Sequence, residues 1–218
     1  MTNPNLTHIE FLLDRSGSMD TIKSDVEGGF NAYIADQCAQ PGQCTVSLTQ
    51  FDDEYDVVFT AFDVGDVPKL KLEPRGWTAL LDAIGRSINS LGMRLAQMPE
   101  DRRPDTVIFA IMTDGLENAS REYTHAAIKA MITRQEQVYN WQFLYMGADQ
   151  DAIEVGARIG IARGRSLTYD RGYAKEAYAA ASTLTGMIKA VKADGQAPDA
   201  VQFSEADRAA TVGDKEQS

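Results

Sequence analysis

The sequence predicts an α/β domain built on a mostly parallel sheet, and two observations carry that prediction. Short apolar runs with the length of strands alternate along the whole chain with stretches whose apolar residues recur at helical spacing. Several of the apolar runs are continuous, which is typical of strands that are covered on both faces. These patterns predict a doubly wound, Rossmann-like sheet of six strands with helices on both faces and one antiparallel edge strand.

The first half of the chain contains three predicted strands and two predicted helices. A continuous apolar run begins it, and Pro41-Gly42 ends the helical pattern that follows. The acidic turn Asp52-Asp53-Glu54 joins the next two strands into a hairpin, which would supply the antiparallel edge. The expected elements are a strand at 9–13, a helix at 21–38, strands at 45–51 and 55–62, and a helix that opens at 76–78 and continues through 88.

The second half repeats the alternation of strands and helices. The expected elements are a strand at 106–112, a helix at 124–138, a strand at 141–146, a short helix at 149–159, a weak strand at 165–169 and a closing helix at 173–191. We therefore predict one domain over residues 5–193. An acidic, flexible tail at 194–218 would follow it, with Val201-Gln202-Phe203 as the segment able to dock locally.

Composition narrows the class of partner. The net charge of −11 argues against nucleic acid and against an anionic membrane surface, since both are bound through Lys and Arg. No segment approaches the ~18 consecutive apolar residues of a membrane helix, and the N-terminus lacks the basic region of a signal peptide. Cys38 and Cys44 are accordingly expected to be reduced thiols in a cytoplasmic protein.

Three loops predicted at one edge of the sheet carry oxygen-bearing side chains. Asp14 ends the first strand, with Ser16 and Ser18 in the turn after it. Thr78 lies where a helix begins, and Asp114 ends another buried strand. In open α/β sheets, ligands bind beyond the carboxyl ends of the strands. A set of donors that contains only oxygen suits a hard cation such as Mg²⁺ or Mn²⁺ and disfavours zinc or copper.

Each loop also has a purely structural interpretation. A serine or Thr78 could cap the helix that follows it, and Asp114-Gly115 is a common turn pair. Taken singly, the two interpretations of each loop are evenly balanced. The metal site is favoured because all three loops are predicted at the same edge.

The order and spacing of these residues resemble the metal-ion-dependent adhesion site (MIDAS) of von Willebrand factor type A domains. The resemblance covers about residues 5–191. It is greatest to small stand-alone bacterial proteins of that family, including those of tellurite-resistance and stress gene clusters. The matching motifs are Asp14-x-Ser16-x-Ser18, Gly76-x-Thr78-x-Leu80 and Thr113-Asp114-Gly115.

The resemblance implies how the site would work. Ser16, Ser18 and Thr78 would touch Mg²⁺ or Mn²⁺ directly, with Ca²⁺ less expected, and Asp14 and Asp114 would act directly or through water. An Asp or Glu carboxylate of a partner protein would complete the coordination. Members of the family serve adhesion as well as intracellular complexes. Because no signal or anchor is recognised, the expected function is an intracellular adaptor in a bacterial stress-response or ATPase-associated complex.

Five residues are candidates for a role at the rim of the site. Arg15 and Trp77 are predicted to flank the metal and contact the partner, since Arg and Trp are favoured at interfaces. Local packing of Trp77 and neutralisation of carboxylates by Arg15 are the alternatives. Glu117, with Asp52 and Asp53, is expected near the rim, either tuning the site or simply solvated.

Catalysis is not expected. Ser16 stands where a haloacid-dehalogenase pattern needs a second aspartate, and no nucleotide-binding phosphate loop is present. A hydrolase would need a general base near the metal. His8 and His125 are instead predicted to be surface or packing residues. Metal-assisted phosphoryl transfer or hydrolysis, and a scaffold that works without metal, remain the alternative functions.

Overall fold

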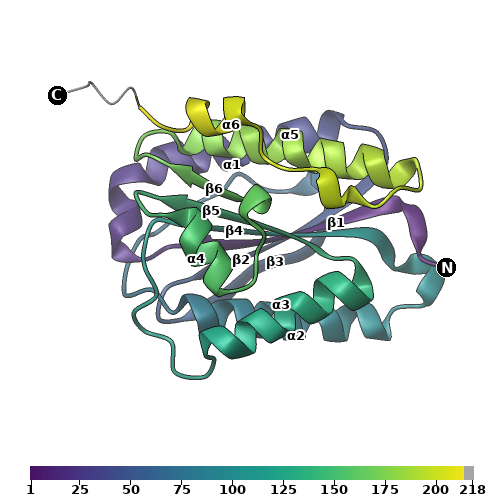
Figure 1. Ribbon diagram of the computed structural model, residues 1–218, viewed down its shortest axis with the longest axis horizontal. Helices are drawn as coiled ribbons and strands as arrows, with labels where there is room; N and C mark the ends of the chain where they lie inside the picture. The colour runs from purple at the N-terminus through teal and green to yellow at the C-terminus, as the bar shows by residue number, and fades with distance from the viewer. Residues whose placement is uncertain (214–218) are drawn as a thin grey trace.

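A six-stranded sheet forms the centre of the computed structural model, which describes residues 1–213 (Figure 1). The strand order is β3-β2-β1-β4-β5-β6, and only the β2–β3 pair is antiparallel. This is the predicted fold class. The strands are β1 (Asn3–Asp14), β2 (Gln43–Phe51), β3 (Tyr55–Asp63), β4 (Pro104–Thr113), β5 (Gln142–Ala148) and β6 (Ser166–Tyr169).

Helices cover both faces of the sheet (Figure 1). On one face lie α1 (Lys23–Ala39), α5 (Ala174–Ala193) and α6 (Glu205–Ala210), and on the other lie α2 (Leu80–Gln97), α3 (His125–Tyr139) and α4 (Ala152–Arg158). Short 3-10 turns join them, namely η1 (Gly17–Ile22), η2 (Val64–Asp66), η3 (Glu100–Arg102), η4 (Arg163–Arg165) and η5 (Pro198–Ala200).

The expected helix at 149–159 begins later than predicted. Asp149 has a left-handed backbone with a φ of 48°, which a helix cannot contain. The side chain of Asp151 accepts a hydrogen bond from the backbone N–H of Glu154 at 2.9 Å, and this cap begins α4 at Ala152.

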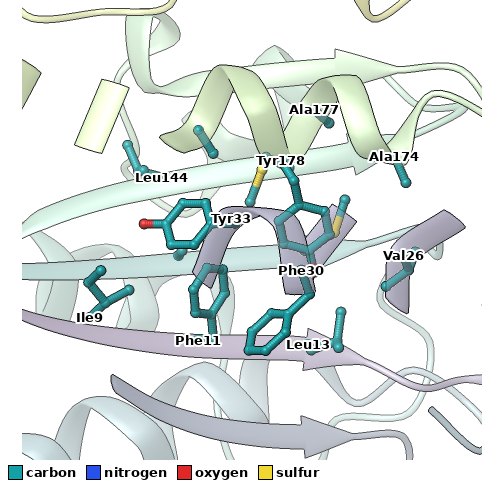
Figure 2. Close-up of a cluster of buried hydrophobic side chains, with 14 of the residues drawn as sticks. Ile9, Phe11, Leu13, Val26, Phe30, Tyr33, Leu144, Ala174, Ala177 and Tyr178 are labelled. Atoms are coloured by element: carbon teal, nitrogen blue, oxygen red, sulfur yellow. The ribbon is translucent and has the colours of Figure 1, made fainter. Parts of the chain in front are cut away.

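Alternation along β1 divides the apolar core into two layers. Ile9, Phe11 and Leu13 face α1 and α5, whereas Leu12 faces the layer of α2 and α3. In the first layer the ring of Phe11 meets those of Phe30 and Tyr33 edge to face, with centroids 5.1 and 5.0 Å apart (Figure 2). Both faces of this strand are therefore buried, which explains its continuous apolar run.

The strand order places the carboxyl ends of β1 and β4 side by side at the topological switch point. From β1 the chain passes outward to β2 and β3, and then crosses over to β4, β5 and β6. The crevice at such a reversal is where open α/β sheets bind ligands. The side chains that follow Leu13 in β1 and Met112 in β4 are thus delivered to one place.

The segment expected to be a flexible tail is partly folded. Val201 and Phe203 are buried in the core layer of α1 and α5, as the docking of Val201-Gln202-Phe203 requires. A capping box between Ser204 and Asp207 begins α6, and the Asp170 N–H donates to the Thr211 carbonyl at 2.8 Å. The prediction of a flexible tail is therefore wrong between 198 and 211, because burial of two large apolar side chains outweighs the polarity of the segment. Residues 214–218 lie outside the described part.

Both cysteines are free, as predicted: Cys38 is exposed, and burial raises the pKa of the Cys44 thiol to about 11. Within residues 1–213, none of the helices combines the length and the apolarity that crossing a membrane requires.

A buried polar network lies between β1 and α2. His8 Nδ1 is 2.9 Å from Thr45 Oγ1, and His8 Nε2 is 3.1 Å from Glu10 Oε2. Arg94 places Nη2 2.8 Å from His8 Nε2 and 3.2 Å from Glu10 Oε2. Because a guanidinium can only donate, the contact with Arg94 requires an unprotonated Nε2. His8 is thus a packing residue, as expected, and burial lowers its pKa.

We expect His8 to lower the free energy of unfolding as the pH drops below ~6.5, the pKa of an unfolded histidine, whereas Asp14, whose pKa burial raises to about 6, acts in the opposite direction. At such pH the histidine of the unfolded chain is protonated, whereas folded His8 stays neutral. The free energy of unfolding therefore changes by at most ~1.4 kcal/mol per pH unit because of this group. His8→Gln should remove this contribution from the pH profile of the stability, whereas His125→Gln should leave the profile like that of wild type, because His125 is exposed. Urea unfolding from pH 5 to 8 measures the difference, and equal slopes in wild type and His8→Gln would contradict it.

Candidate metal centre

The side-chain oxygens of the five predicted residues lie together at the carboxyl edge of the sheet. We call them the oxygen cluster: Asp14, Ser16, Ser18, Thr78 and Asp114. Asp14 is the last residue of β1 and Asp114 directly follows β4, while Ser16 immediately precedes η1 and Ser18 is the second residue of η1. Thr78 lies two residues before α2. Of the five, only Ser18 is exposed.

Hydrogen bonds link four members of the oxygen cluster. Asp14 Oδ1 accepts from the Ser16 N–H at 2.6 Å, and the Ser16 and Ser18 hydroxyls are 3.1 Å apart. Ser18 Oγ donates to Asp114 Oδ1 at 2.6 Å, which joins the first loop to the third. Thr113 Oγ1 donates to Asp14 Oδ2 at 2.5 Å and ties the ends of β1 and β4 together.

Thr78 completes the cluster beside Gly115. A Cβ added to Gly115 would lie 2.7 Å from Thr78 Oγ1 and 3.6 Å from Asp14 Oδ2. The Thr78 hydroxyl and the Asp14 carboxylate therefore border the same space, and glycine is required there because any side chain would strike Thr78. The Asp114-Gly115 turn thus belongs to the cluster.

The hydroxyls do not cap helices. Ser16 precedes η1, but its side chain makes no capping hydrogen bond. The N-cap position of α2 is occupied by Ala79 rather than Thr78. Since capping was the structural alternative for these residues, the three hydroxyl oxygens are left for another role.

The two carboxylates are buried close to each other. Burial raises the pKa of Asp14 to about 6, the charge of Asp114 adds to this, and hydrogen bonds from Thr113 and Ser16 oppose it. Burial likewise raises the pKa of Asp114. Asp114 Oδ2 has no hydrogen-bond partner among residues 1–213, although the Arg171 guanidinium lies 3.2 Å away.

This donor set fits a hard divalent cation. Two carboxylates and three neutral hydroxyls offer oxygen alone, and one buried carboxylate oxygen is left without a hydrogen bond. In the described part of the chain, no group of three or more His, Cys, Asp or Glu side chains could hold a metal. A metal at this edge would therefore depend on the hydroxyls as well as on the aspartates.

The loop that carries Thr78 is held by two neighbouring loops. The φ of Gly76 is 68°, and a Cβ there would lie 2.0 Å from Asp53 Oδ1, so only glycine fits. The Thr78 N–H donates to Asn118 Oδ1 at 2.9 Å, and the Thr78 carbonyl accepts from the Asn118 N–H at 3.0 Å. These contacts fix the hydroxyl of Thr78 against Gly115.

The structure corrects two of the three predicted partner contacts. Arg15 is buried, and it pairs with Asp52 Oδ2 at 3.1 Å and Asp56 Oδ2 at 3.0 Å, so it neutralises carboxylates inside the domain. Glu117 uses both carboxylate oxygens to accept from the N–H groups of 81, 119 and 120, and thereby holds the start of α2. Trp77, by contrast, is 68% exposed.

Of the two aspartates expected near the rim, only one is exposed. Asp52 is fully buried, and its Oδ2 also accepts from Arg75 Nε at 2.9 Å. Asp53 is exposed, and it accepts from the Trp77 N–H at 3.1 Å. Asp52 therefore supports the loops from inside, and Asp53 holds Trp77 at the rim.

Three further residues organise the site without having been predicted from the sequence: Thr113, Asn118 and Arg171. Thr113 stood in the motif but was assigned no role, although its hydroxyl joins Asp14 to the turn at Gly115. Asn118 and Arg171 carry no motif. The one available signal for Arg171 was its position after the last strand, because every parallel strand ends at this edge.

Comparison with known proteins gives structural relatives only, since no family model and no curated protein matches the sequence. Proximal thread matrix protein 1 from the mussel byssus has a TM-score of 0.61 and 13% identity, over 85% of this chain and 48% of that one. A structure of the same protein with a zinc-occupied MIDAS motif has a TM-score of 0.54 and 14% identity, over 84% and 47%.

A bacterial structure is similar to the same extent. A von Willebrand factor type A protein from Catenulispora acidiphila has a TM-score of 0.57 and 15% identity, over 85% of this chain and 43% of that one. This chain thus spans less than half of the chain in each of these three structures. At such low identity the similarity establishes the fold alone: the chain has the fold of von Willebrand factor type A domains.

Proposed function

We propose that the chain is a metal-dependent protein-interaction module. A divalent cation, Mg²⁺ or Mn²⁺, would be held by the oxygen cluster and would bind an Asp or Glu side chain of a partner protein. One observation carries this proposal. Two buried carboxylates converge with three hydroxyls that cap no helix, all from three loops, and Asp114 Oδ2 is left without a hydrogen bond.

Each residue of the cluster has a separate role in this proposal. Ser16, Ser18 and Thr78 would hold the cation through neutral hydroxyls, and Asp14 and Asp114 through carboxylate oxygens or bridging water. The three hydroxyls carry no charge, so direct contacts with them cancel none of the charge of the cation, and a bound cation would therefore attract a further carboxylate. The zinc reported in the MIDAS motif of the mussel protein supports a divalent cation in this fold.

The surface around the cluster supports the binding of a protein. Trp77 and Leu116 are 68% and 63% exposed, and they lie on the loops that carry Thr78 and Asp114. Large apolar side chains at the surface favour protein contacts, and Trp is a frequent anchor. The partner would therefore present an acidic residue with apolar neighbours.

We propose binding rather than catalysis. Of the two histidines, His8 belongs to the network under α2 and His125 is exposed at the start of α3, so neither is placed as a base beside Asp14. The two cysteines are free, which fits a reducing compartment such as the cytoplasm. We therefore propose that the protein acts there as an adaptor in a stress-response or ATPase-associated complex.

Substitution of Thr78 tests the proposed function. Thr78→Val keeps the shape of the side chain and removes one ligand oxygen, so we expect Mg²⁺ and Mn²⁺ to bind at least ~10-fold more weakly, as on loss of a charge-assisted contact. Isothermal titration calorimetry measures the affinity. Thr183→Ala, an exposed threonine within α5, is the matched control and should bind like wild type.

The partner is tested with the same proteins. In pull-downs from native lysate, a partner should be captured by wild type and Thr183→Ala in Mg²⁺, and lost with EDTA or with Thr78→Val. Capture that is equal in EDTA would instead favour the scaffold that works without metal. If Thr78→Val binds metal with the affinity of wild type, the proposal that the oxygen cluster holds the cation is wrong.

A further inference from the structure

Arg171 reaches across the carboxyl edge of the sheet to the oxygen cluster. It follows β6 by two residues, yet its guanidinium contacts the ends of three other segments. Nη2 lies 3.2 Å from Asp114 Oδ2, Nε donates to Asp149 Oδ2 at 2.5 Å, and Nη1 donates to the Ser18 carbonyl at 3.3 Å and to Thr21 Oγ1 at 2.8 Å.

The charge of Arg171 lies where a metal cation would act. Among the described residues, Arg171 is the one basic side chain within 4.0 Å of an Asp14 or Asp114 carboxylate oxygen. The side chain of Asp114 is 0% exposed, whereas that of Arg171 is 38% exposed. The guanidinium therefore covers the carboxylate from the solvent side, and it can leave without unpacking the core.

The carboxylate oxygen that Arg171 covers is the one without a hydrogen bond. Asp114 Oδ1 accepts from Ser18, whereas Oδ2 has the ion pair with Arg171 but no hydrogen bond of acceptable geometry. An off-axis ion pair neutralises charge without satisfying the lone pairs of the oxygen. Asp114 is thus held by a partner that a better-placed cation could displace.

We propose that Arg171 is a tethered cation that competes with the divalent metal for Asp114 and so sets the affinity of the site. This inference rests on the proposed function, because it assumes that the oxygen cluster holds a metal. When Mg²⁺ or Mn²⁺ binds, the guanidinium loses its pair with Asp114 and keeps its pair with Asp149. The loop between β6 and α5 is thereby coupled to occupancy of the site.

Asp149 holds Arg171 in this position. Its backbone is left-handed, with a φ of 48°, and its Oδ1 accepts from the Arg171 N–H at 3.1 Å while Oδ2 accepts from Nε. Backbone strain of this kind persists only where surrounding contacts determine it. Both the main chain and the side chain of Arg171 are thus held by Asp149, which directly follows β5, so the guanidinium stays beside the site after it releases Asp114.

A purely structural role for Arg171 makes the opposite prediction. If Arg171 only holds its loop against η1 and Asp149, its removal should destabilise the carboxyl edge of the sheet and leave the metal affinity unchanged or lower. If it competes with the metal, its removal should tighten metal binding. A gain of affinity is a result that a damaged site does not produce.

The test is calorimetric titration of Mn²⁺ and Mg²⁺ into three full-length variants at low ionic strength. Arg171→Gln should bind each metal between ~2-fold and ~10-fold more tightly than wild type, as expected for removal of a partly exposed charge beside the metal. Arg171→Lys keeps the charge and should stay within ~2-fold of wild type. Arg158→Gln, which removes an exposed arginine paired with Glu154 in α4, should not change the affinity.

The outcomes separate this inference from the proposed function. Unchanged or weaker binding by Arg171→Gln, with a thermal transition like that of wild type, overturns the competition by Arg171 and leaves the metal site standing. Failure of wild type and Arg171→Gln alike to bind metal overturns both proposals. In ~0.5 M salt the difference between the two proteins should shrink, because exposed charges are screened.

Discussion

Asp14→Asn should stabilise the protein in EDTA and abolish its stabilisation by Mg²⁺ or Mn²⁺. In the absence of a metal the ionised Asp14 is fully buried and faces the charge of Asp114, and its pKa of about 6 reflects that cost. Removal of the charge should raise the free energy of unfolding by ~1–3 kcal/mol at pH 7.5. Saturating metal at ~100 times its Kd, by contrast, stabilises only the wild type, by ~2.7 kcal/mol.

The asparagine can be accommodated with its hydrogen bonds made. Its Oδ1 still accepts from the Ser16 N–H, while its amide can donate to Thr113 Oγ1, which already lies 3.1 Å from the Gly115 carbonyl and can donate there instead. Urea unfolding with EDTA or with saturating Mg²⁺ gives the four free energies. If Asp14→Asn is less stable than wild type in EDTA, the carboxylate is a structural group rather than one kept for a cation.

Tyr178→Ala should destabilise the domain by ~3–5 kcal/mol, the range seen when a buried aromatic ring is deleted. Tyr178 is fully buried, its ring contacts those of Phe11, Phe30 and Tyr33, and a Cβ on Gly29 would lie 2.5 Å from Tyr178 Cδ2 (Figure 2). The space around the ring is therefore filled from both helices, and its walls cannot collapse without moving α1 or α5.

Tyr178→Phe provides the matched control. The Tyr178 hydroxyl is buried with no hydrogen-bond partner among the described residues, so its removal should be neutral or stabilising by up to ~1–3 kcal/mol. Urea unfolding compares the three proteins. A loss in Tyr178→Phe that approaches the loss in Tyr178→Ala would mean that the hydroxyl, rather than ring packing, stabilises the junction of α1 and α5.

The fold was predictable because its signals are local. The apolar run that ends at Asp14 and the helical spacing after it depend on neighbouring residues, and the strand order then follows from the pattern of crossovers. The five residues of the oxygen cluster were predictable for the same reason, since each follows a recognisable strand or precedes a helix. For Trp77 the sequence allowed either a position at the rim or local packing, and the side chain is exposed.

The remaining features depend on contacts between distant residues. The burial of Arg15 is set by Asp52 and Asp56 from the hairpin that follows, and the position of Arg171 is set by Asp149 and Asp114. No periodicity encodes which carboxylate a long basic side chain will meet. Phe203 likewise packs in the core layer of α1 and α5, which is formed by residues from several distant segments. No single segment of the sequence predicts that contact.

The packing of the C-terminal segment decides where an affinity tag can be attached. Asp170, the neighbour of Arg171, is bonded through its N–H to the Thr211 carbonyl and through its carboxylate to the Gly213 N–H. A fusion at the C-terminal side would therefore pull on the loop that reaches Asp114. A tag placed before Met1 is joined instead at the start of β1, at the other end of the strand from Asp14, and leaves the binding edge undisturbed.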